Sequence, residues 1–219
     1  MSATGRGAER RASDYYPTPA WCIWRLLDAL SLPCRCTWLE PAAGDGAIVR
    51  AVNAVVPDLD WVAVDIRPEC EEPLRAAGAE LTIGSFLDLP MSWQATRGVF
   101  DVAILNPPFT LAQQFIERCK GMARWVVALE RLNFLEGDER CEWLRADPPD
   151  VYVLPNRPSF TGEGTDATAY AWLVWPPERG RAHGKVQILA TTHTDDRRAR
   201  LVVTPQGDVV PAQGRLAIG

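Results

Sequence analysis

Apolar residues along the chain alternate between helical spacing and short unbroken runs. Helical spacing first appears at Ala20 and continues at positions 23, 24, 27 and 30, until Pro33 stops it. It recurs over residues 48–56, in a short stretch ending at Gly78, and over residues 111–120 and 139–145. Short runs rich in Val, Ile, Leu and Trp predict strands at residues 37–40, 61–66, 81–83, 100–105, 125–129, 151–154, 170–175 and 186–190.

Strands that alternate with helices indicate an α/β fold, with a mostly parallel sheet covered on both faces. The last strands have no helices between them, so we expect the sheet to finish with an antiparallel hairpin. A long polar loop over residues 156–168 separates two of these strands. Loops of that length inside a compact domain are often functional.

The 219 residues suit one domain, which we place at residues 14–176, between a disordered tail at 1–13 and a small extension at 177–219. The chain has no apolar stretch of about 18 residues, so no membrane helix is predicted. The N-terminal arginines are not followed by the apolar run of a secretory signal. We therefore expect an intracellular, cytoplasmic protein.

The cysteine spacing and the net charge bear on two functions, metal binding and nucleic-acid binding. Cys34 and Cys36 form the only close cysteine pair, and His183 and His193 stand far from it, so no metal site is predicted. The net charge of −5 is unusual for a nucleic-acid enzyme, because phosphate contacts usually supply much of the affinity. Arginines gather at residues 6–11, 179–185 and 197–200, where solvated surface is the commoner explanation.

The turn after the first predicted strand has features of a nucleoside site. It runs from Leu39 to Gly46, and Gly44 and Gly46 allow the backbone to turn tightly and approach a ligand. Asp65 ends the next strand, at the spacing where a carboxylate accepts hydrogen bonds from a ribose diol. A glycine-rich turn between a strand and a helix is ordinary by itself. Together with the spaced acid, it favours a nucleoside cofactor.

The charges of this turn favour a cationic cofactor over a dinucleotide. Glu40 and Asp45 would repel a pyrophosphate, and the turn lacks a third glycine. S-adenosyl-L-methionine carries a sulfonium and an ammonium, which acidic residues stabilise. After the third strand, Asp88 is placed to accept from the adenine amine, with Phe86 against the ring.

A second unusual turn follows the strand at residues 100–105. Asn106, Pro107, Pro108 and Phe109 end a buried strand with two prolines, which cannot extend a sheet but stiffen the chain. An exocyclic amine on an aromatic ring is a poor nucleophile. The Asn106 side-chain oxygen and the Pro107 carbonyl can each accept one of its N–H bonds and aim its lone pair at a methyl donor. Phe109 would stack on the base.

This segment resembles the Asn/Asp-Pro-Pro-aromatic motif of the amino methyltransferases, best known among the N6-adenine DNA methyltransferases. Residues 39–46 resemble the cofactor motif of that family, and residues 16–19 its N-terminal motif. The similarity covers residues 14–175 and implies a Rossmann-like methyltransferase fold with a mostly parallel seven-stranded sheet. It implies cofactor contacts at Tyr16, Pro17, Thr18, Glu40, Pro41, Ala42, Gly44, Asp45, Gly46, Asp65, Ile66, Phe86, Asp88 and Asn106.

The resemblance also implies that the target adenine leaves the base stack to reach the cofactor. A second wall opposite Phe109 is then needed, and we expect it at Phe160 in the long loop, although Phe160 could equally anchor that loop. Tyr170, Trp172 and Trp175 are expected in the core instead. Sequence-specific members carry a sizeable recognition domain, for which residues 176–219 leave little room. We therefore expect relaxed sequence specificity, or recognition completed by a partner chain.

Three alternatives stay open at this point. RNA adenine methylation uses the same loop chemistry as methylation of DNA. Methylation of a protein glutamine would use the same acceptors, but that group usually has a substantial N-terminal helical domain. A catalytically silent nucleic-acid-binding or scaffold domain is disfavoured by the complete motif. The resemblance fits a bacterial chromosome, a phage or a mobile element equally well.

Overall fold

The computed structural model describes residues 16–56, 58–160, 165–177 and 184–193, together with the backbone of residues 201–203 and 209–211. The predicted tail at residues 1–13 lies outside this part, as do most of the predicted extension and the arginine groups at 6–11 and 197–200. His183 also lies outside it. Within the described part, no helix is long and apolar enough to cross a membrane.

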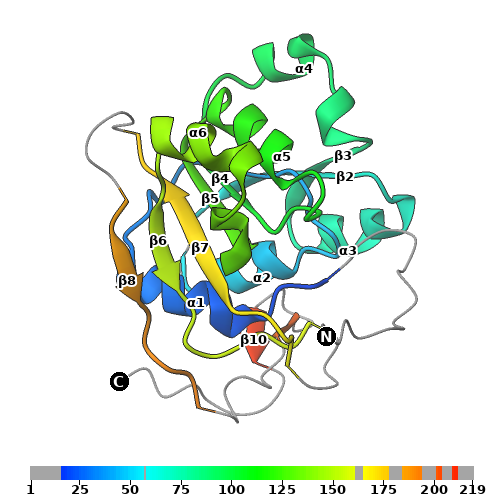
Figure 1. Cartoon of the computed structure of the whole chain (residues 1–219). Helices are drawn as coiled ribbons and strands as arrows, with labels where there is room; N and C mark the ends of the chain where they lie inside the picture. Colours follow the sequence, from blue (N-terminus) through cyan, green and yellow to red (C-terminus); the bar gives the residue numbers. More distant parts are fainter. Residues whose placement is uncertain are drawn as a thin grey trace.

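The centre of the molecule is an eight-stranded sheet of order β3-β2-β1-β4-β5-β7-β6-β8 (Figure 1). All neighbouring strands are parallel except for β7, which runs antiparallel to both β5 and β6. The strands are β1 (Thr37–Glu40), β2 (Asp60–Asp65), β3 (Ala79–Ile83), β4 (Phe100–Leu105), β5 (Ala123–Arg131), β6 (Asp150–Val153), β7 (Tyr170–Trp175) and β8 (Val186–Ile188). A separate antiparallel pair joins β9 (Leu201–Val203) and β10 (Val209–Pro211).

The predicted antiparallel hairpin is the pair β6 and β7. The sheet has one strand more than the seven that the resemblance implies, because the strand predicted at residues 186–190 is β8, which adds in parallel to β6 at the edge. An edge strand offers a row of unpaired backbone donors and acceptors, which a later segment of the chain can pair with.

Helices cover both faces of the sheet (Figure 1). One face packs against α1 (Ala20–Ala29), α2 (Ala47–Asn53) and α3 (Glu71–Ala76). The other packs against α4 (Met91–Ala95), α5 (Ala112–Lys120) and α6 (Asp138–Ala146). Side chains of a strand alternate between the faces, so Val102 and Ile104 of β4 enter the first core, and Ala103 and Leu105 enter the second.

The strand order reverses between β1 and β4, which lie side by side with Leu39 opposite Ala103. β2 and β3 extend the sheet from β1, and β5 and the later strands extend it from β4. Open α/β sheets bind ligands beyond the carboxyl ends of their strands at such a reversal. The two turns singled out in the sequence follow β1 and β4, so the fold brings them to that point.

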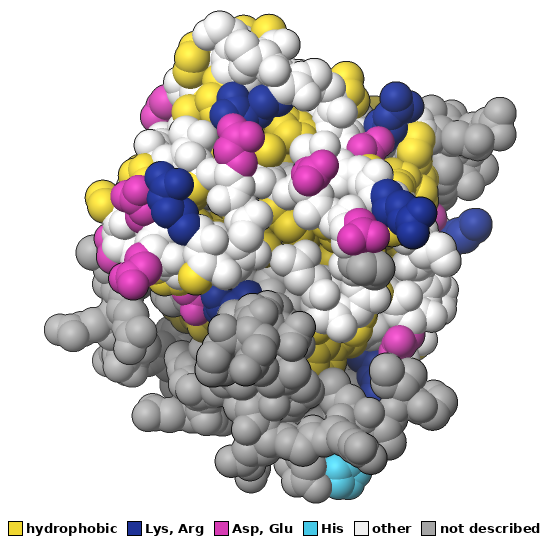
Figure 2. Space-filling model, turned by 180° about the vertical axis from the view of Figure 1, so that it is seen from behind, with side chains coloured by type: hydrophobic (Ala, Val, Ile, Leu, Met, Phe, Trp, Pro, Cys, Tyr) yellow, Lys and Arg dark blue, Asp and Glu magenta, His cyan; other side chains and the backbone are white. Residues whose placement is uncertain are grey.

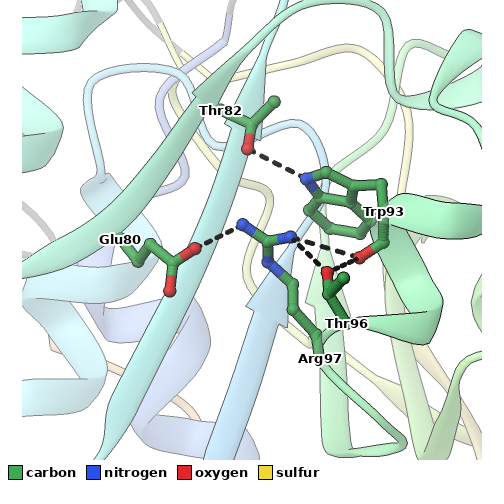
Figure 3. Close-up of polar contacts among 5 residues, drawn as sticks. All are labelled: Glu80, Thr82, Trp93, Thr96 and Arg97. Atoms are coloured by element: carbon green, nitrogen blue, oxygen red, sulfur yellow. Dashed lines mark hydrogen bonds and ion pairs between the residues drawn. The ribbon is translucent and has the colours of Figure 1, made fainter.

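A short 3₁₀ helix (Phe86–Asp88) and α4 connect β3 to β4, and a polar cluster fixes this connection to the sheet (Figure 3). Trp93 of α4 donates its indole N–H to the Thr82 hydroxyl of β3, at 3.1 Å. Arg97 lies 4.5 Å over the Trp93 ring and forms an ion pair with Glu80 of β3. These contacts fix the second half of the connection to β3, and they thereby help to fix the preceding segment, residues 84–89.

Charged side chains on the face seen in Figure 2 are mixed, with basic groups lying beside acidic ones. Such mixing agrees with the ion pairs of the described surface, for example Arg75 with Glu71 and Arg145 with Glu142. Exposed pairs of this kind contribute little to stability, on the order of 0–1 kcal/mol each. This face therefore offers no continuous basic surface among the residues drawn in colour.

Candidate functional site

A cavity of about 300 Å³ opens beyond the carboxyl ends of β1, β2, β3 and β4. Ligand pockets of proteins begin at about this size. The predicted cofactor residues that line it are Tyr16, Pro17, Thr18, Glu40, Pro41, Ala42, Gly44, Asp45, Asp65, Ile66, Phe86 and Asn106, and Pro108 of the predicted catalytic loop joins them. The sequence did not single out Arg67, Ser85, Thr110 or Phe115, which also line the cavity.

The turn after β1 is tied to β2 by backbone hydrogen bonds. The Ala43 N–H donates to the Val64 carbonyl at 3.0 Å. Gly44 and Gly46 have φ of 58° and 82°, in the left-handed region that residues with a Cβ rarely adopt. A Cβ at Gly46 would also lie 3.1 Å from the Leu74 side chain. Gly46 does not line the cavity and instead lets α2 start where it does.

Glu40 is buried at the end of β1, with 2% of its surface exposed, and Oε2 has no hydrogen-bond partner among the described residues. Burial raises the pKa of this carboxyl well above its usual range, and the neighbouring Asp45 raises it further. Asp45 pairs with Arg50 at 3.1 Å through Oδ2, whereas its buried Oδ1 has no partner in the described part. Unsatisfied buried oxygens are costly, so this end of the cavity fits a cationic donor such as an ammonium.

Asp65 ends β2 with its carboxylate 5% exposed and fully engaged. Gly44 N–H donates to Oδ2 at 2.7 Å, and the Arg67 guanidinium binds both oxygens at 2.9 and 3.0 Å. Burial by itself would raise the pKa of Asp65, but these hydrogen bonds outweigh it and hold the pKa below its ordinary value. Ile66 beside it is 64% exposed and lines the cavity, where an apolar ring would cover it.

The segment after β3 forms another wall. Phe86 is buried against Phe115, with ring centres 5.3 Å apart, and Ser85 lies beside it in the lining. Asp88 is exposed and does not line the cavity, so its proposed contact with an adenine amine gains no support from the geometry. Arg118 of α5 holds the segment, since it donates to the Leu87 carbonyl at 2.7 Å.

Asn106 follows β4 and has its amide oriented by the N-terminal segment. Its Nδ2 donates to the Tyr16 carbonyl and to the Thr18 hydroxyl, both at 3.1 Å. A carbonyl oxygen only accepts, so the Tyr16 contact requires the amino group on that side. The Asn106 Oδ1 is thereby left as an acceptor at the cavity wall. Pro107 is buried and does not line the cavity.

The structure brings Phe109 and Phe160 into one aromatic cluster next to the cavity. Tyr16 stacks on Phe109 at 6.3 Å and meets Phe160 edge-on at 5.9 Å. Tyr170, fully buried in β7, contacts both Phe109 at 6.3 Å and Phe160 at 5.2 Å. The prediction of Tyr170 as a core residue agrees with its burial, but its ring also forms the base of this cluster.

Arg131 at the end of β5 connects the cluster to the long loop. Its guanidinium lies 4.0 Å from the centre of the Phe109 ring, and its Nε donates to the Tyr170 hydroxyl at 3.0 Å. The Tyr170 hydroxyl donates in turn to Asp166 of the loop at 2.8 Å. Residues 161–164 of that loop lie outside the described part.

No group of three or more His, Cys, Asp and Glu side chains in the described ranges is arranged to hold a metal ion. The described cysteines are all free, and Cys22, Cys70 and Cys119 are buried. Burial raises the pKa of the Cys22 and Cys70 thiols, so both favour the neutral thiol at ordinary pH.

Comparisons with known proteins identify the fold. No protein-family model matches the chain, and no curated protein matches its sequence. Solved structures do match. A predicted O-methyltransferase from Agrobacterium tumefaciens is 18% identical, with a TM-score of 0.57, over 77% of this chain and 86% of that one.

A protein from Listeria monocytogenes, described as a class I S-adenosylmethionine-dependent methyltransferase, is 12% identical, with a TM-score of 0.50 over 78% of this chain and 63% of that one. A precorrin-6y C5,15-methyltransferase from Geobacter metallireducens is 13% identical, with a TM-score of 0.51 over 68% and 84% of the two chains. The chain therefore has the Rossmann-like class I methyltransferase fold, as the sequence predicted. Because one fold serves many acceptors, the acceptor must be argued from the site.

Proposed function

We propose that this protein transfers the methyl group of S-adenosylmethionine to the N6 amine of adenine in DNA. The observation that supports methyl transfer to an amine is the orientation of Asn106, whose amino group is held by Tyr16 and Thr18. The choice of DNA rests on the resemblance of residues 106–109 to the motif of the N6-adenine DNA methyltransferases. Its Oδ1 is an oriented acceptor in the wall of a nucleoside-sized cavity. An acceptor in that place suits an N–H donor such as an exocyclic amine.

The cavity fits S-adenosylmethionine at both of its ends. The carboxyl groups of Glu40 and Asp45, which both line the cavity, suit the ammonium of the methionine part. Asp65 suits the ribose hydroxyls, and the exposed Ile66 and the buried Phe86 suit the faces of the adenine ring. The cofactor, once bound, supplies an electrophilic methyl group on its sulfonium.

The residues after β4 prepare the amine for attack. In this proposal Asn106 Oδ1 accepts one N–H hydrogen bond, which draws the nitrogen towards tetrahedral geometry and localises its lone pair. The Pro107 carbonyl is the second acceptor that the motif implies, although Pro107 lies outside the cavity lining. The nitrogen–carbon bond forms as the carbon–sulfur bond breaks, and the nitrogen then releases one proton to water. Rigid prolines keep the acceptors in place, so little reorganisation is needed.

The aromatic cluster supplies a place for a base outside the helix stack. Phe109 and Phe160 belong to the same cluster, through their contacts with Tyr16 and Tyr170. Bases extruded for chemistry are commonly held between aromatic or apolar side chains. This arrangement supports a nucleobase over a glutamine side chain, which has no ring to stack.

The proposal is tested by incubating the protein with methyl-labelled S-adenosylmethionine and, separately, duplex DNA, single-stranded DNA, RNA and a protein extract. We expect label in DNA, recovered as N6-methyladenine after digestion and mass spectrometry. Label confined to RNA or to protein glutamine would move the assignment to that substrate. Absence of label in every acceptor would support a catalytically silent domain.

A further inference from the structure

The carboxylate of Asp65 has no acceptor position left for a ligand. Oδ1 accepts from the Arg67 backbone N–H at 2.9 Å and from the Arg67 Nε at 2.9 Å. Oδ2 accepts from the Gly44 N–H at 2.7 Å and from the Arg67 Nη2 at 3.0 Å. An ionised carboxylate offers about four lone-pair sites. All of them are used by the protein itself.

Two of these four bonds are parts of the fold. The Gly44 N–H belongs to the turn after β1, and the Arg67 N–H belongs to the backbone directly after β2. The other two come from one side chain, the Arg67 guanidinium, which binds in the bidentate geometry that arginine and carboxylate favour. The Arg67 side chain is 15% exposed and lines the same cavity. Its Nε and Nη2 are the two donors of the four that can leave without disturbing the backbone.

We propose that Arg67 competes with the cofactor for Asp65, because its guanidinium occupies the two positions on Asp65 that the ribose hydroxyls of the cofactor require. Binding therefore exchanges two charged hydrogen bonds from Arg67 for two neutral ones from the ribose. The inference rests on the proposed function, since it assumes a ribose at Asp65. Arg67 thus weakens cofactor binding, whereas Asp65 and the other residues of the cavity wall strengthen it.

The exchange has a consequence for turnover. Hydrogen bonds that a charged guanidinium donates to a carboxylate are stronger than those that neutral hydroxyls donate, so Arg67 weakens the binding of every ligand with this ribose. S-adenosylmethionine and its product S-adenosylhomocysteine share the ribose and are weakened equally. Such uniform weakening raises KM for the cofactor without slowing methyl transfer, and it speeds the release of product.

The test compares Arg67→Ala with the wild-type protein by calorimetry with S-adenosylmethionine and S-adenosylhomocysteine. We expect both dissociation constants to fall, by on the order of tenfold, because the ribose no longer competes with a charged donor. Arg67→Lys keeps the charge but not the bidentate contact, so its constants should lie between the two. KM for the cofactor should fall with the dissociation constant, while kcat does not decrease.

Arg75→Ala is the matched control, because it removes the same charge from an exposed arginine paired with Glu71 on α3. Its cofactor affinity should equal that of the wild type. Arg67 variants that bind the cofactor as weakly as the wild type, or more weakly, would overturn the role of Arg67. Thermal unfolding with and without cofactor distinguishes a variant that does not fold from one that does not bind. A folded Arg67→Ala protein should gain a larger increase in melting temperature from the cofactor than the wild type does.

Failure of the proposed function gives a different result. A wild-type protein that does not bind S-adenosylmethionine, or whose affinity is unchanged in Asp65→Ala, would overturn the ribose assignment and the role of Arg67 with it. A wild-type protein whose binding depends on Asp65, but does not tighten in the Arg67 variants, would overturn the role of Arg67 alone.

Discussion

The amino group and the oxygen of the Asn106 amide have different partners. The amino group joins the end of β4 to the segment before α1, through Tyr16 and Thr18, and in the proposed function the oxygen accepts from the substrate amine. One side chain thus both organises the cavity wall and offers the acceptor. Replacement of this residue separates substrate chemistry from cofactor binding.

Asn106→Ala should lower kcat by about a hundredfold or more, because an oriented dipole at the reacting nitrogen is lost. Binding of S-adenosylmethionine should be largely kept, since Glu40 and Asp65 remain. Single-turnover rates and calorimetry measure the two effects. Asn133→Ala, at an exposed position of the segment after β5, serves as the control and should behave as the wild type. Unchanged turnover in Asn106→Ala would contradict the assigned role.

If the proposed function holds, we expect Glu40 to make cofactor binding depend on pH. Its pKa is raised in the free protein by burial and then by Asp45, and a bound ammonium favours the ionised form. Affinity should therefore increase as pH rises through the raised pKa, and binding below that pH should release a proton. Calorimetry over a pH series, in buffers of different ionisation enthalpy, detects both effects.

Glu40→Gln keeps the shape of the side chain and removes its charge. We expect the affinity for S-adenosylmethionine to fall by on the order of tenfold and its pH dependence to disappear. Adenosine has no ammonium, so its affinity should be the same in both proteins. A pH dependence that persists in Glu40→Gln would assign the proton to another group.

At the scale of elements, the last turn of α5 carries two basic residues with different surroundings. Arg118 contacts the wall of the cavity, and Lys120 contacts tryptophans at the opposite end of the sheet. Arg118 donates to the carbonyls of Leu87 and Leu89 and lies 5.1 Å from the centre of the Phe86 ring. Lys120 lies between the rings of Trp143 and Trp175, at 4.4 and 4.3 Å. The two residues therefore stabilise the same helix but act on different surroundings.

Arg118→Met should lower the free energy of unfolding by about 2 kcal/mol, because two carbonyls lose their donors. It should also weaken cofactor binding several-fold, since the wall that holds Phe86 loosens. Lys120→Met should lower the free energy of unfolding by about 1–2 kcal/mol with no change in cofactor affinity. Denaturant unfolding and calorimetry provide the comparison. Equal effects of both variants on cofactor affinity would argue against support of the wall by Arg118.

At the scale of the whole molecule, the antiparallel course of β7 delivers the long loop to the site. Tyr170 pairs with Arg131 at the ends of β7 and β5, so the loop that precedes β7 arrives beside the segment after β4. Arg131 joins the three parts through Phe109, Tyr170 and Asp166. We expect this connection to act on the nucleic acid and not on the cofactor.

Arg131→Met should reduce kcat/KM for DNA by about tenfold, because the Phe109 ring and the loop lose their common support. The affinity for S-adenosylmethionine should stay as in the wild type. Arg124→Met, on the same strand at its opposite end and paired with Asp101, is the matched control. A loss of cofactor affinity in Arg131→Met, or an equal effect of Arg124→Met, would contradict this assignment.

Several elements are predictable from local pattern alone. The strands Thr37–Glu40, Phe100–Leu105 and Tyr170–Trp175 have the bounds that their apolar runs indicate, and α1 begins at Ala20 as expected. The helix predicted over residues 48–56 ends earlier, at Asn53, because the next residues form a tighter turn in which Val55 N–H donates to the Val52 carbonyl. The sequence does not predict the helix α4, because it has only five residues and its contacts are to distant segments, β3, β4 and the end of α5.

The sequence by itself determined the α/β class and the positions and order of the turns after β1 and β4, because periodicity, glycine and proline act on neighbouring residues. Only the tertiary structure decided which distant groups meet: Asn106 with the Tyr16 carbonyl, Arg118 with the segment at Phe86, and Arg131 with Phe109. Strand order sets these encounters, and a local pattern does not contain it. The same holds for the guanidinium of Arg67, since a sequence names the residue beside an acid but not the bonds that it makes.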